Sequence, residues 1–463
     1  MSSSISKDLA IIGGGISGLA ALHFARTLRP ALAAALYEKE ARLGGTVGTD
    51  RVAGYSFDWG PNGFLDREPL TLRLAGELGL EDRLERASAA VQKRFILRGG
   101  RLREVPMSPP AFLRSDILSL RGRLRVAMEP FGRKRPEGID ESVYDFARRR
   151  IGREAADYLV QPMVSGVYGG MADRLSLRAT FRLMAEMEAE YGSLLRAMVA
   201  KMRATKRSGR AAGGPAGPGG WLTSFRGGLD AVIARARERY GDDIATGAGA
   251  VCIERDGRGY RVGLADGREV RAPRVILATP SYEAAALVRP LSAKLSEALA
   301  AIEYAPIAVV CSGYDGAAVG RAVDGFGFLV PRVEGRRILG SIWTSSIFAD
   351  RAPAGKVQFR TMVGGDGDRE VMNLTDEELQ ETVHRDLSAV MALRGGPEVI
   401  RIYRWERGIP QFTIGHLARL ALIEAELARL GNIAVTGNAY YGIGLNDCVK
   451  QSFRAVGELP ERL

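Results

Sequence analysis

Cysteine and histidine are scarce in this chain, which contains only three of each among 463 residues. The cysteines stand far apart and form no CxxC pair: Cys252, Cys311 and Cys448. This excludes a disulfide framework, and we expect three reduced, buried thiols in an intracellular protein. The histidines are equally scattered, without an HExxH motif or a His/Asp cluster, so the sequence predicts no metal site. His23 lies in an apolar helical pattern, and we expect a structural role for it.

Long apolar runs are also missing, and none approaches the ~20 residues that a membrane-spanning helix requires. The first residues, "MSSSISKD", lack the charged and apolar regions of a signal peptide. We therefore expect a cytoplasmic protein, or one that lies on a membrane surface without crossing it. The net charge of +11 suits nucleic acid, an anionic membrane or an acidic small molecule. Because no nucleic-acid-binding motif is present, we predict no nucleic-acid partner.

Glycine, in contrast, is concentrated in the stretch "LAIIGGGISGLA", residues 9–20. Gly13, Gly15 and Gly18 have GxGxxG spacing between a short apolar strand and the helical pattern "ISGLAALHFARTL". The first glycine permits a tight turn, the second lets a pyrophosphate approach the backbone, and the third lets the helix pack against the strand. The helix N-terminus attracts the phosphates. A second apolar strand ends at Glu38, whose carboxylate can bond an adenosine ribose and would repel a 2′-phosphate. The sequence therefore predicts dinucleotide binding.

The segment "EKEARLGG", residues 38–45, indicates which dinucleotide is bound. Its arginine and second glycine pair extend the phosphate site, a feature of flavoproteins that resemble amine oxidases. The sequence has no second GxGxxG motif for a nicotinamide, and we identify no cysteine or histidine that would link a flavin. We therefore predict FAD, bound non-covalently.

The order of strand-like and helix-like patterns predicts an α/β fold with α+β insertions. The Rossmann-type FAD-binding domain is expected to be discontinuous and to comprise residues 1–70, 221–282 and 426–463. A mixed-sheet substrate domain is expected at 71–95 and 283–425, with a helix over 375–392. Residues 96–207 read as a helical domain, and 208–220 read as a flexible Gly/Pro loop. A glycine-rich turn after the last strand, in "NIAVTGNAYYGIGLNDC", is expected to return beside the first glycine turn and to cap the flavin.

Two stretches of the helical region have a second interpretation. Residues 112–135 interleave apolar residues with arginines, as in a basic amphipathic helix on an anionic membrane, but a solvated basic face fits equally well. A second set is spaced as one helical face: Met184, Met187, Tyr191, Leu194, Leu195, Met198 and Met202. Core packing is the favoured interpretation of this set, with an apolar substrate channel as the alternative.

Several motifs together resemble the oxygen-dependent protoporphyrinogen oxidases, in order and over essentially the whole chain. They are "IIGGGISGLAALH", "ARLGGTVGT", "WGPNGFLDREP", "KRFILRGGRLREVPMSPPAFL", "SGVYGGMADRLSL", "FGFLVPR", "WERGIPQFTIGH" and "GNAYYGIGLNDC". The resemblance implies an amine oxidase-like fold with FAD, substrate and helical membrane-docking domains, and often a homodimer. It implies the six-electron oxidation of protoporphyrinogen IX to protoporphyrin IX, with O2 as acceptor and H2O2 as product, in haem biosynthesis. It also implies a bacterial enzyme that lies peripherally on the inner face of the cell membrane.

The resemblance also implies roles for single residues. FAD contacts carry over to Gly13, Gly14, Gly15, Ile16, Ser17, Gly18, Glu38, Lys39, Thr46, Gly60, Pro61, Asn62, Gly63, Val251, Asn438, Ile443, Gly444 and Leu445. Asn62 is expected between flavin and substrate, where animal members tend to carry arginine, and the backbone at Gly169 is expected to make a polar contact. Substrate contacts carry over to Arg94, Phe326, Gly327, Leu329 and Met362, of which the last two are also plausible core residues.

Three other functions compete with this interpretation. The nearest rival is oxidation of coproporphyrinogen III, which has four carboxylates, to coproporphyrin III. A wider rival is an amine oxidase or a desaturase-like flavoenzyme. The third is a flavin-bound membrane scaffold without turnover, which peroxide release with a porphyrinogen would distinguish from an enzyme.

Overall fold

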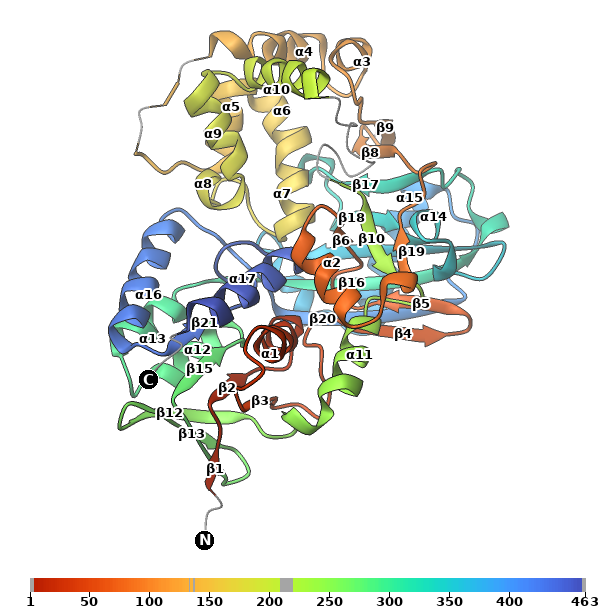
Figure 1. Cartoon of the computed structure of the whole chain (residues 1–463). Helices are drawn as coiled ribbons and strands as arrows, with labels where there is room; N and C mark the ends of the chain where they lie inside the picture. Colours follow the sequence, from red (N-terminus) through yellow and green to blue (C-terminus); the bar gives the residue numbers. More distant parts are fainter. Residues whose placement is uncertain (1–3, 133, 136–137, 209–219, 460–463) are drawn as a thin grey trace.

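The computed structural model describes residues 4–132, 134–135, 138–208 and 220–459 of the chain. Helices α3 to α10 gather at one end of the molecule, and the sheets lie below them (Figure 1). The predicted Gly/Pro loop lies almost entirely outside the described residues, since only its two ends, at 208 and 220, are described.

A five-stranded parallel sheet forms the dinucleotide-binding part, as the glycine motif predicted. Its order is β11 (Ile244–Ala245), β3 (Ala34–Tyr37), β2 (Leu9–Ile12), β15 (Arg274–Leu277) and β21 (Ile433–Val435). One face packs against α1 (Ile16–Leu28), α2 (Pro69–Glu77), α11 (Ala231–Tyr240) and α17 (Leu445–Glu458). The other face packs against α12 (Ser281–Val288), α13 (Ala293–Ala300) and α16 (His416–Leu430). Apart from Arg274 at the start of β15, these strands are apolar, as expected for a sheet that is covered on both faces.

The same core includes a four-stranded sheet with the order β1 (Ser4–Ser6), β14 (Glu269–Ala272), β13 (Gly259–Leu264) and β12 (Ala250–Asp256). Cys252 lies in β12, at the edge of this sheet, and is half-exposed, whereas Cys311 and Cys448 are buried. The prediction that all three thiols are buried was therefore wrong for Cys252, because an edge strand is covered on fewer sides than a central one.

A seven-stranded mixed sheet forms the second large layer. Its order is β20 (Val399–Pro410), β16 (Tyr304–Asp315), β19 (Lys356–Gly364), β18 (Ile338–Trp343), β17 (Gly325–Leu329), β8 (Lys93–Arg98) and β9 (Arg101–Glu104). Only the pair β17 and β8 is parallel. Helix α15 (Asp376–Met391), which begins with a Thr375–Glu378 capping box, packs on one face of this sheet. The predicted domain boundary at residue 95 falls inside β8, because this strand continues to Arg98 and pairs with β9.

Smaller elements connect the two large sheets. They are a three-stranded sheet of β6 (Phe64–Leu65), β10 (Leu222–Phe225) and β7 (Leu84–Arg86), the hairpin β4 (Thr49–Val52) and β5 (Tyr55–Asp58), and the short helix α14 (Thr344–Ile347). Single 3-10 turns lie at Glu81–Arg83, Glu129–Phe131, Gly241–Asp243, Gly316–Ala318, Arg332–Glu334, Ala349–Arg351 and Arg369–Asn373.

The helical region contains α3 (Pro109–Arg114), α4 (Leu120–Ala127), α5 (Val143–Ile151), α6 (Arg153–Ala155), a π-helical turn (Ala156–Val160), α7 (Gln161–Tyr168), α8 (Leu177–Thr180), α9 (Arg182–Tyr191) and α10 (Leu194–Ser208). Residues 112–135 therefore do not form one amphipathic helix. The chain leaves α3 at Ser115, and the Ser119 side chain caps a new helix by accepting the Gly122 N–H at 3.1 Å.

The methionine-rich face is divided between two helices for a related reason. Helix α9 ends at Gly192, which adopts a left-handed conformation with φ 70°. The buried Glu129 carboxylate then accepts the Leu194 and Leu195 N–H groups at 3.0 and 3.1 Å and pairs with the buried Arg150. These contacts start α10 in a new direction. In the part of the chain that the structure describes, no helix combines the length and the apolar character needed to cross a membrane.

Candidate cofactor and substrate site

The three motif glycines have three different physical requirements in the structure. Gly13 has φ +107°, a conformation that L side chains rarely adopt. A Cβ on Gly18 would overlap the Gly13 carbonyl oxygen, so this position holds α1 against the turn. A Cβ on Gly15 would meet nothing within 4 Å, and the N-terminus of α1 has no side-chain cap. The structure therefore leaves open space in front of the free N–H groups of α1, as pyrophosphate binding requires.

The Glu38 carboxylate lies at the carboxyl end of β3, beside the glycine turn. It accepts the N–H groups of Gly14 and of Glu40, the latter at 2.9 Å. The backbone of Glu38 bonds both Ala245 and Ala248 at 2.8 Å, which brings the connection into β12 alongside it. Val251 follows in β12 with 58% of its surface exposed. Glu38 and Val251 thus border the same end of the sheet, while Lys39 pairs with Glu283 at 3.0 Å.

The segment after Glu38 folds against the glycine turn. The Gly44 N–H donates to the Gly14 carbonyl at 2.8 Å, and Gly44 forms an isolated bridge with Gly15. Arg42 donates to the Leu43 carbonyl at 2.8 Å, and its guanidinium lies 4.4 Å from the centre of the Trp59 ring. Arg42 thus holds this loop through the Leu43 carbonyl and the Trp59 ring, and it leaves the backbone of the glycine turn accessible.

The C-terminal turn returns to the same place, as predicted. The Ser452 hydroxyl of α17 donates to the Ser17 carbonyl of α1 at 2.8 Å. The Asn446 side-chain amide donates to the Leu65 carbonyl at 2.8 Å. Residues 438–445 thereby lie between the start of α1 and the Gly60–Gly63 segment. Leu445 is buried in the core of the parallel sheet, and Ile443 packs against the base of the helical region.

The Gly60–Gly63 segment joins the glycine loops to the seven-stranded sheet. A Cβ on Gly60 would overlap the Thr46 carbonyl oxygen, and Arg360 of β19 donates to the Gly60 carbonyl. Asn62 has a buried side-chain nitrogen with no hydrogen-bond partner. A buried donor of this kind usually has a partner in the functional state, so Asn62 is available to a ligand here.

The predicted substrate residues share one face of the seven-stranded sheet. Leu329 pairs with Gly340, which pairs with Met362, so these positions form one row across β17, β18 and β19. Ile96 is the partner of Leu329 in β8, and Arg94 lies two residues before it, on the same side of the strand. The opposite face packs against α15, so this row lies on the face that is turned away from that helix.

Arg94 and Phe326 lie together at one end of this face. The Arg94 guanidinium is 5.5 Å from the centre of the Phe326 ring, and partial burial lowers the pKa of Arg94. Its neighbour Lys93 points the other way and pairs with Asp324 at 2.5 Å. Gly327 has φ +135°, and a Cβ there would overlap the Ser341 carbonyl oxygen, so this strand requires glycine.

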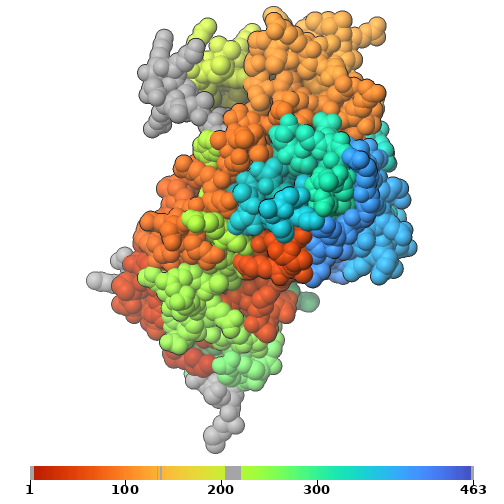
Figure 2. All heavy atoms as spheres, turned by 90° about the vertical axis from the view of Figure 1, so that its right-hand side faces the viewer, coloured from red at the N-terminus to blue at the C-terminus, as the bar shows by residue number. Residues whose placement is uncertain are grey.

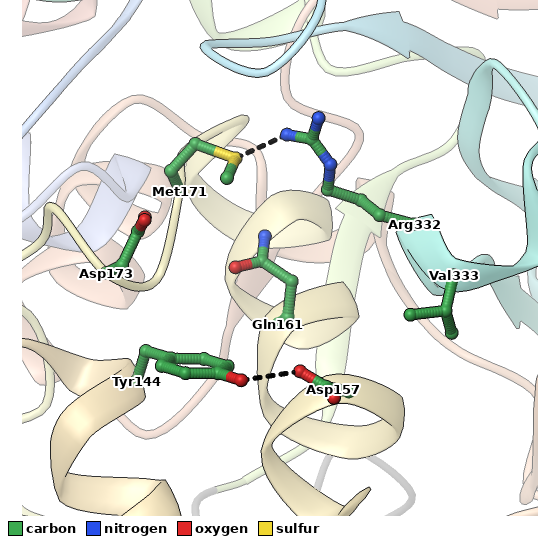
Figure 3. A pocket seen from close by; sticks show the side chains of 7 residues that line it. All are labelled: Tyr144, Asp157, Gln161, Met171, Asp173, Arg332 and Val333. Atoms are coloured by element: carbon green, nitrogen blue, oxygen red, sulfur yellow. Dashed lines mark hydrogen bonds between the residues drawn. The ribbon is translucent and has the colours of Figure 1, made fainter. Parts of the chain in front are cut away.

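Gly169 lies at the other end of the face, where it ends α7 with φ 58°. Its carbonyl accepts the Asp366 N–H at 2.7 Å. The cavity beside it is also lined by Ser165, Met171, Leu339, Gly364, Gly367, Asp368 and three arginines, Arg332, Arg336 and Arg337. Figure 3 shows the adjoining pocket, where Arg332 reaches across to the Met171 sulfur and Tyr144 donates to Asp157 at 2.8 Å.

The sequence analysis missed Arg360, which is 6% exposed and reaches the Gly60 carbonyl. It also missed the buried pair of Arg351 and Asp58, of which Asp58 lies shortly before the Gly60–Gly63 segment in the sequence. The available signal was a charged residue inside the strand pattern "VQFRTMVGG". Charged residues are rarely buried unless they are paired, so a buried arginine indicates a specific role.

The arrangement fits FAD. An open glycine cradle, uncapped helix N–H groups, a carboxylate at the end of the second strand and an unpartnered Asn62 nitrogen lie along one path. That path ends beside an apolar sheet face with a half-buried arginine. A fold and site of this kind define an FAD-dependent oxidoreductase.

The chain belongs to the flavin-containing amine oxidoreductase family, whose model matches residues 16–459. It is 32% identical to the chloroplastic protoporphyrinogen oxidase of Oryza sativa subsp. japonica, over 99% of this chain and 89% of the relative. It is 29% identical to the coproporphyrinogen III oxidase of Staphylococcus aureus, over 98% and 99% of the two chains. A crystal structure of a candidate protoporphyrinogen oxidase from Exiguobacterium sp. 255-15 matches with a TM-score of 0.83 at 27% identity, covering 99% of both chains.

Replacing Glu38 with alanine should weaken FAD binding roughly tenfold or more. A hydrogen bond to a charged acceptor contributes about 1.5–3 kcal/mol, and a tenfold change in affinity is about 1.4 kcal/mol. Dilution of the loaded protein, followed by flavin fluorescence, measures the change. Glu40→Ala, at the exposed neighbour, is the matched control. Unchanged flavin occupancy in Glu38→Ala would contradict the ribose role.

Proposed function

We propose that this enzyme oxidises protoporphyrinogen IX to protoporphyrin IX in haem biosynthesis, a six-electron reaction with O2 as acceptor and H2O2 as product. The observation that supports this best is the apolar sheet face that begins at Arg94 and Phe326 and ends beside Gly169. Apolar side chains on one sheet face, with a cation at its edge, suit a large, flat, poorly soluble substrate that carries carboxylates.

In this proposal the protein's own groups bind, orient and shield. Arg94 would pair with a propionate through two parallel hydrogen bonds, which fix the orientation of the ring as well as adding affinity. Phe326, Leu329 and Met362 would supply apolar contacts, and Asn62 would lie between substrate and cofactor. Bound flavin would supply the hydride acceptor, so no nucleophile or metal is required of the protein.

The flavin is proposed to be bound non-covalently. Cys448, the cysteine at the start of α17, is buried, and burial raises the pKa of its thiol to about 12. A thiol of this kind is not a nucleophile at neutral pH, because the thiolate is the reactive form.

Oxidation of coproporphyrinogen III is the second candidate, and the cavity beside Gly169 favours it. Arg94 lies near the start of β8, and Arg332 follows the end of β17. Because these two strands are parallel, the two arginines lie at opposite ends of the face. Arg337 is held by Asp368 at 2.8 Å, whereas Arg332 has no carboxylate within ion-pair distance among the described residues. Cationic groups at both ends suit a substrate with four carboxylates rather than two.

Turnover of the two porphyrinogens by the FAD-loaded protein tests both candidates. Porphyrin fluorescence and peroxide release should rise together in air, and the ratio of kcat/KM values identifies the preferred substrate. Oxidation of simple amines without porphyrin formation would favour the wider rival. Bound flavin without any turnover would favour the scaffold.

We further propose that the end formed by α3, α4 and α10 docks on an anionic membrane surface. Figure 2 shows α3 and α4, in orange, at one extremity of the molecule. Large apolar side chains are exposed on these helices and the turns next to them: Met107, Leu113, Leu120, Leu124, Met128, Phe131, Met198, Val199 and Met202. Such a group, with the exposed Arg114 and Arg121 on the same helices, marks an interaction surface. A homodimer stays a prediction from the family resemblance.

Replacing Leu120, Leu124 and Phe131 together with serine should weaken binding to anionic vesicles at least tenfold. Phe131 is 81% exposed, so the change removes apolar surface without opening the core, and tenfold corresponds to about 1.4 kcal/mol. Vesicle sedimentation measures the loss. Arg123 and Arg125 are left intact because they bond the backbone carbonyls of Leu113 and Arg149.

The control for this variant is Val333→Ser, which removes an apolar side chain that is 58% exposed but lies outside the patch. It should bind vesicles like the parent. If the triple variant also binds like the parent, residues 112–135 form an ordinary solvated face and not a membrane-docking surface.

A further inference from the structure

Three side chains of the seven-stranded sheet hold the segment that leads from β5 into Gly60–Gly63. Gln358 donates to the Ser56 carbonyl at 3.0 Å, the Cys311 thiol lies 3.9 Å from the Asp58 carbonyl, and Arg360 donates to the Gly60 carbonyl. Alternate residues of the segment are thus each fixed by one donor. A neutral amide and a neutral thiol suffice at the first two positions, so a carbonyl contact alone does not explain a guanidinium at the third.

The charge of Arg360 is buried and almost uncompensated. Only 6% of the residue is exposed, its Nε has no hydrogen-bond partner, and burial lowers its pKa. Among the described residues no carboxylate lies within ion-pair distance of it. Cys311, its partner in β16, does not compensate the charge, because burial raises the pKa of this thiol to about 12.

Asp58 is the carboxylate that acts on Arg360 from a greater distance, but it is engaged elsewhere. It accepts the Thr49 hydroxyl at 2.6 Å and the Leu229 N–H at 3.1 Å. Its other oxygen faces the buried Arg351 at 3.6 Å. Arg351 has a second carboxylate, Asp350, at 3.3 Å, whereas Arg360 has only the distant Asp58. A buried cation without a full partner is costly.

A chain of close contacts connects Arg360 to the cofactor site. Gly45 lies against the glycine turn, since a Cβ on Gly45 would be 3.4 Å from the Gly15 Cα. The next residue, Thr46, packs its carbonyl oxygen against Gly60, and the Gly60 carbonyl accepts a hydrogen bond from Arg360. Arg360 also shares its strand and its side of the sheet with Met362, two residues further on. The guanidinium thus stands directly behind the segment that is proposed to border the flavin ring.

We propose that Arg360 is a redox-tuning residue, whose buried positive charge favours the reduced state of the bound flavin. Two-electron reduction of a flavin places negative charge on the ring, and a fixed cation nearby in a low-dielectric site stabilises that charge. The inference rests on the proposed position of the ring beside Gly60–Gly63. It explains why the strand carries an arginine where its neighbours use neutral donors.

The test is the midpoint potential of the FAD-loaded protein, measured by dye-coupled reduction without substrate. Arg360→Gln keeps a donor for the Gly60 carbonyl but removes the charge. It should lower the ratio of reduced to oxidised flavin at a fixed potential at least tenfold, which is about 30 mV for a two-electron couple. Arg360→Lys keeps the charge and should stay near the parental potential. Arg401→Met, at the exposed residue paired with Cys311, is the control and should have no effect.

A parental potential in Arg360→Gln, or an equal fall in Arg360→Lys and Arg360→Gln, would overturn the inference and leave Arg360 as a positioning residue. If Arg360→Gln does not retain FAD, Asp58→Asn gives the opposite test, because removal of the nearby negative charge should raise the potential. An unchanged potential there also overturns it. Porphyrinogen turnover is measured separately, so a failure of the proposed function is distinguishable from a failure of this inference.

Discussion

Replacing Gly15 with alanine should leave a folded protein that binds FAD at least a hundredfold more weakly. Gly15 has φ −71° and ψ 179°, which alanine adopts without strain, and an added Cβ meets no protein atom within 4 Å. The methyl group would instead occupy the space where the pyrophosphate must approach the backbone. A hundredfold loss corresponds to about 2.7 kcal/mol. Titration of the apoprotein with FAD, followed by flavin fluorescence, gives the two dissociation constants.

Two further variants separate cofactor binding from folding. Gly241→Ala adds a Cβ in open space away from the glycine turn and should leave the FAD affinity unchanged. Gly18→Ala should lower the melting temperature of the apoprotein, because its Cβ would overlap the Gly13 carbonyl oxygen. Parental FAD affinity in Gly15→Ala would mean that the pyrophosphate does not lie over this turn.

Replacing Arg94 with alanine should lower kcat/KM for protoporphyrinogen roughly ten- to a hundredfold while the FAD content stays normal. A hydrogen bond to a charged group contributes about 1.5–3 kcal/mol, and here it would also select which carbon lies over the flavin. The side chain is half-buried against Phe326, so it is already oriented before substrate binds. Steady-state kinetics, together with the flavin absorbance of the purified variant, measures both quantities.

The neighbouring residue supplies the matched control for Arg94. Lys93→Ala removes a charge from the same strand, but Lys93 faces solvent and pairs with Asp324, so its kinetics should be parental. Arg94→Lys should recover part of the activity, because it restores the charge but not the two-pronged geometry. Equal effects of Lys93→Ala and Arg94→Ala would indicate a general loss of positive charge rather than a specific contact. Loss of FAD in Arg94→Ala would assign it a structural role.

The sequence predicted the parts of the fold that depend on local pattern. The glycine spacing, the apolar strand that ends at Glu38 and the helix expected over 375–392 each depend on local sequence. The division of 112–135 into two helices was not predicted, although Ser119 is a strong cap and was visible in the sequence. An amphipathic pattern can continue across a helix break, so periodicity alone does not locate the break.

The site was predictable only where a motif marks it. Arg94 and Phe326 were named separately, and their contact depends on the pairing of β8 with β17, which are more than 200 residues apart. The role of Arg360 depends on which face of β19 meets the Gly60–Gly63 segment, a fact of tertiary packing. An arginine inside a strand pattern marks the position, but which segment buries its charge is decided by the assembled sheets.

The discontinuity of the parallel sheet has a consequence for how this protein is made. Strand β2 pairs with β15, and β15 pairs with β21, which the ribosome completes roughly 420 residues after β2. At 5–20 residues per second, the apolar β2 waits about 20–85 s for the last strand of its sheet. The edge of β2 that pairs with β15 stays open until that strand is made, about 265 residues later, and pairings this distant in sequence form slowly. We expect recombinant yield to depend on slow synthesis and chaperone supply, and cofactor loading to follow release from the ribosome.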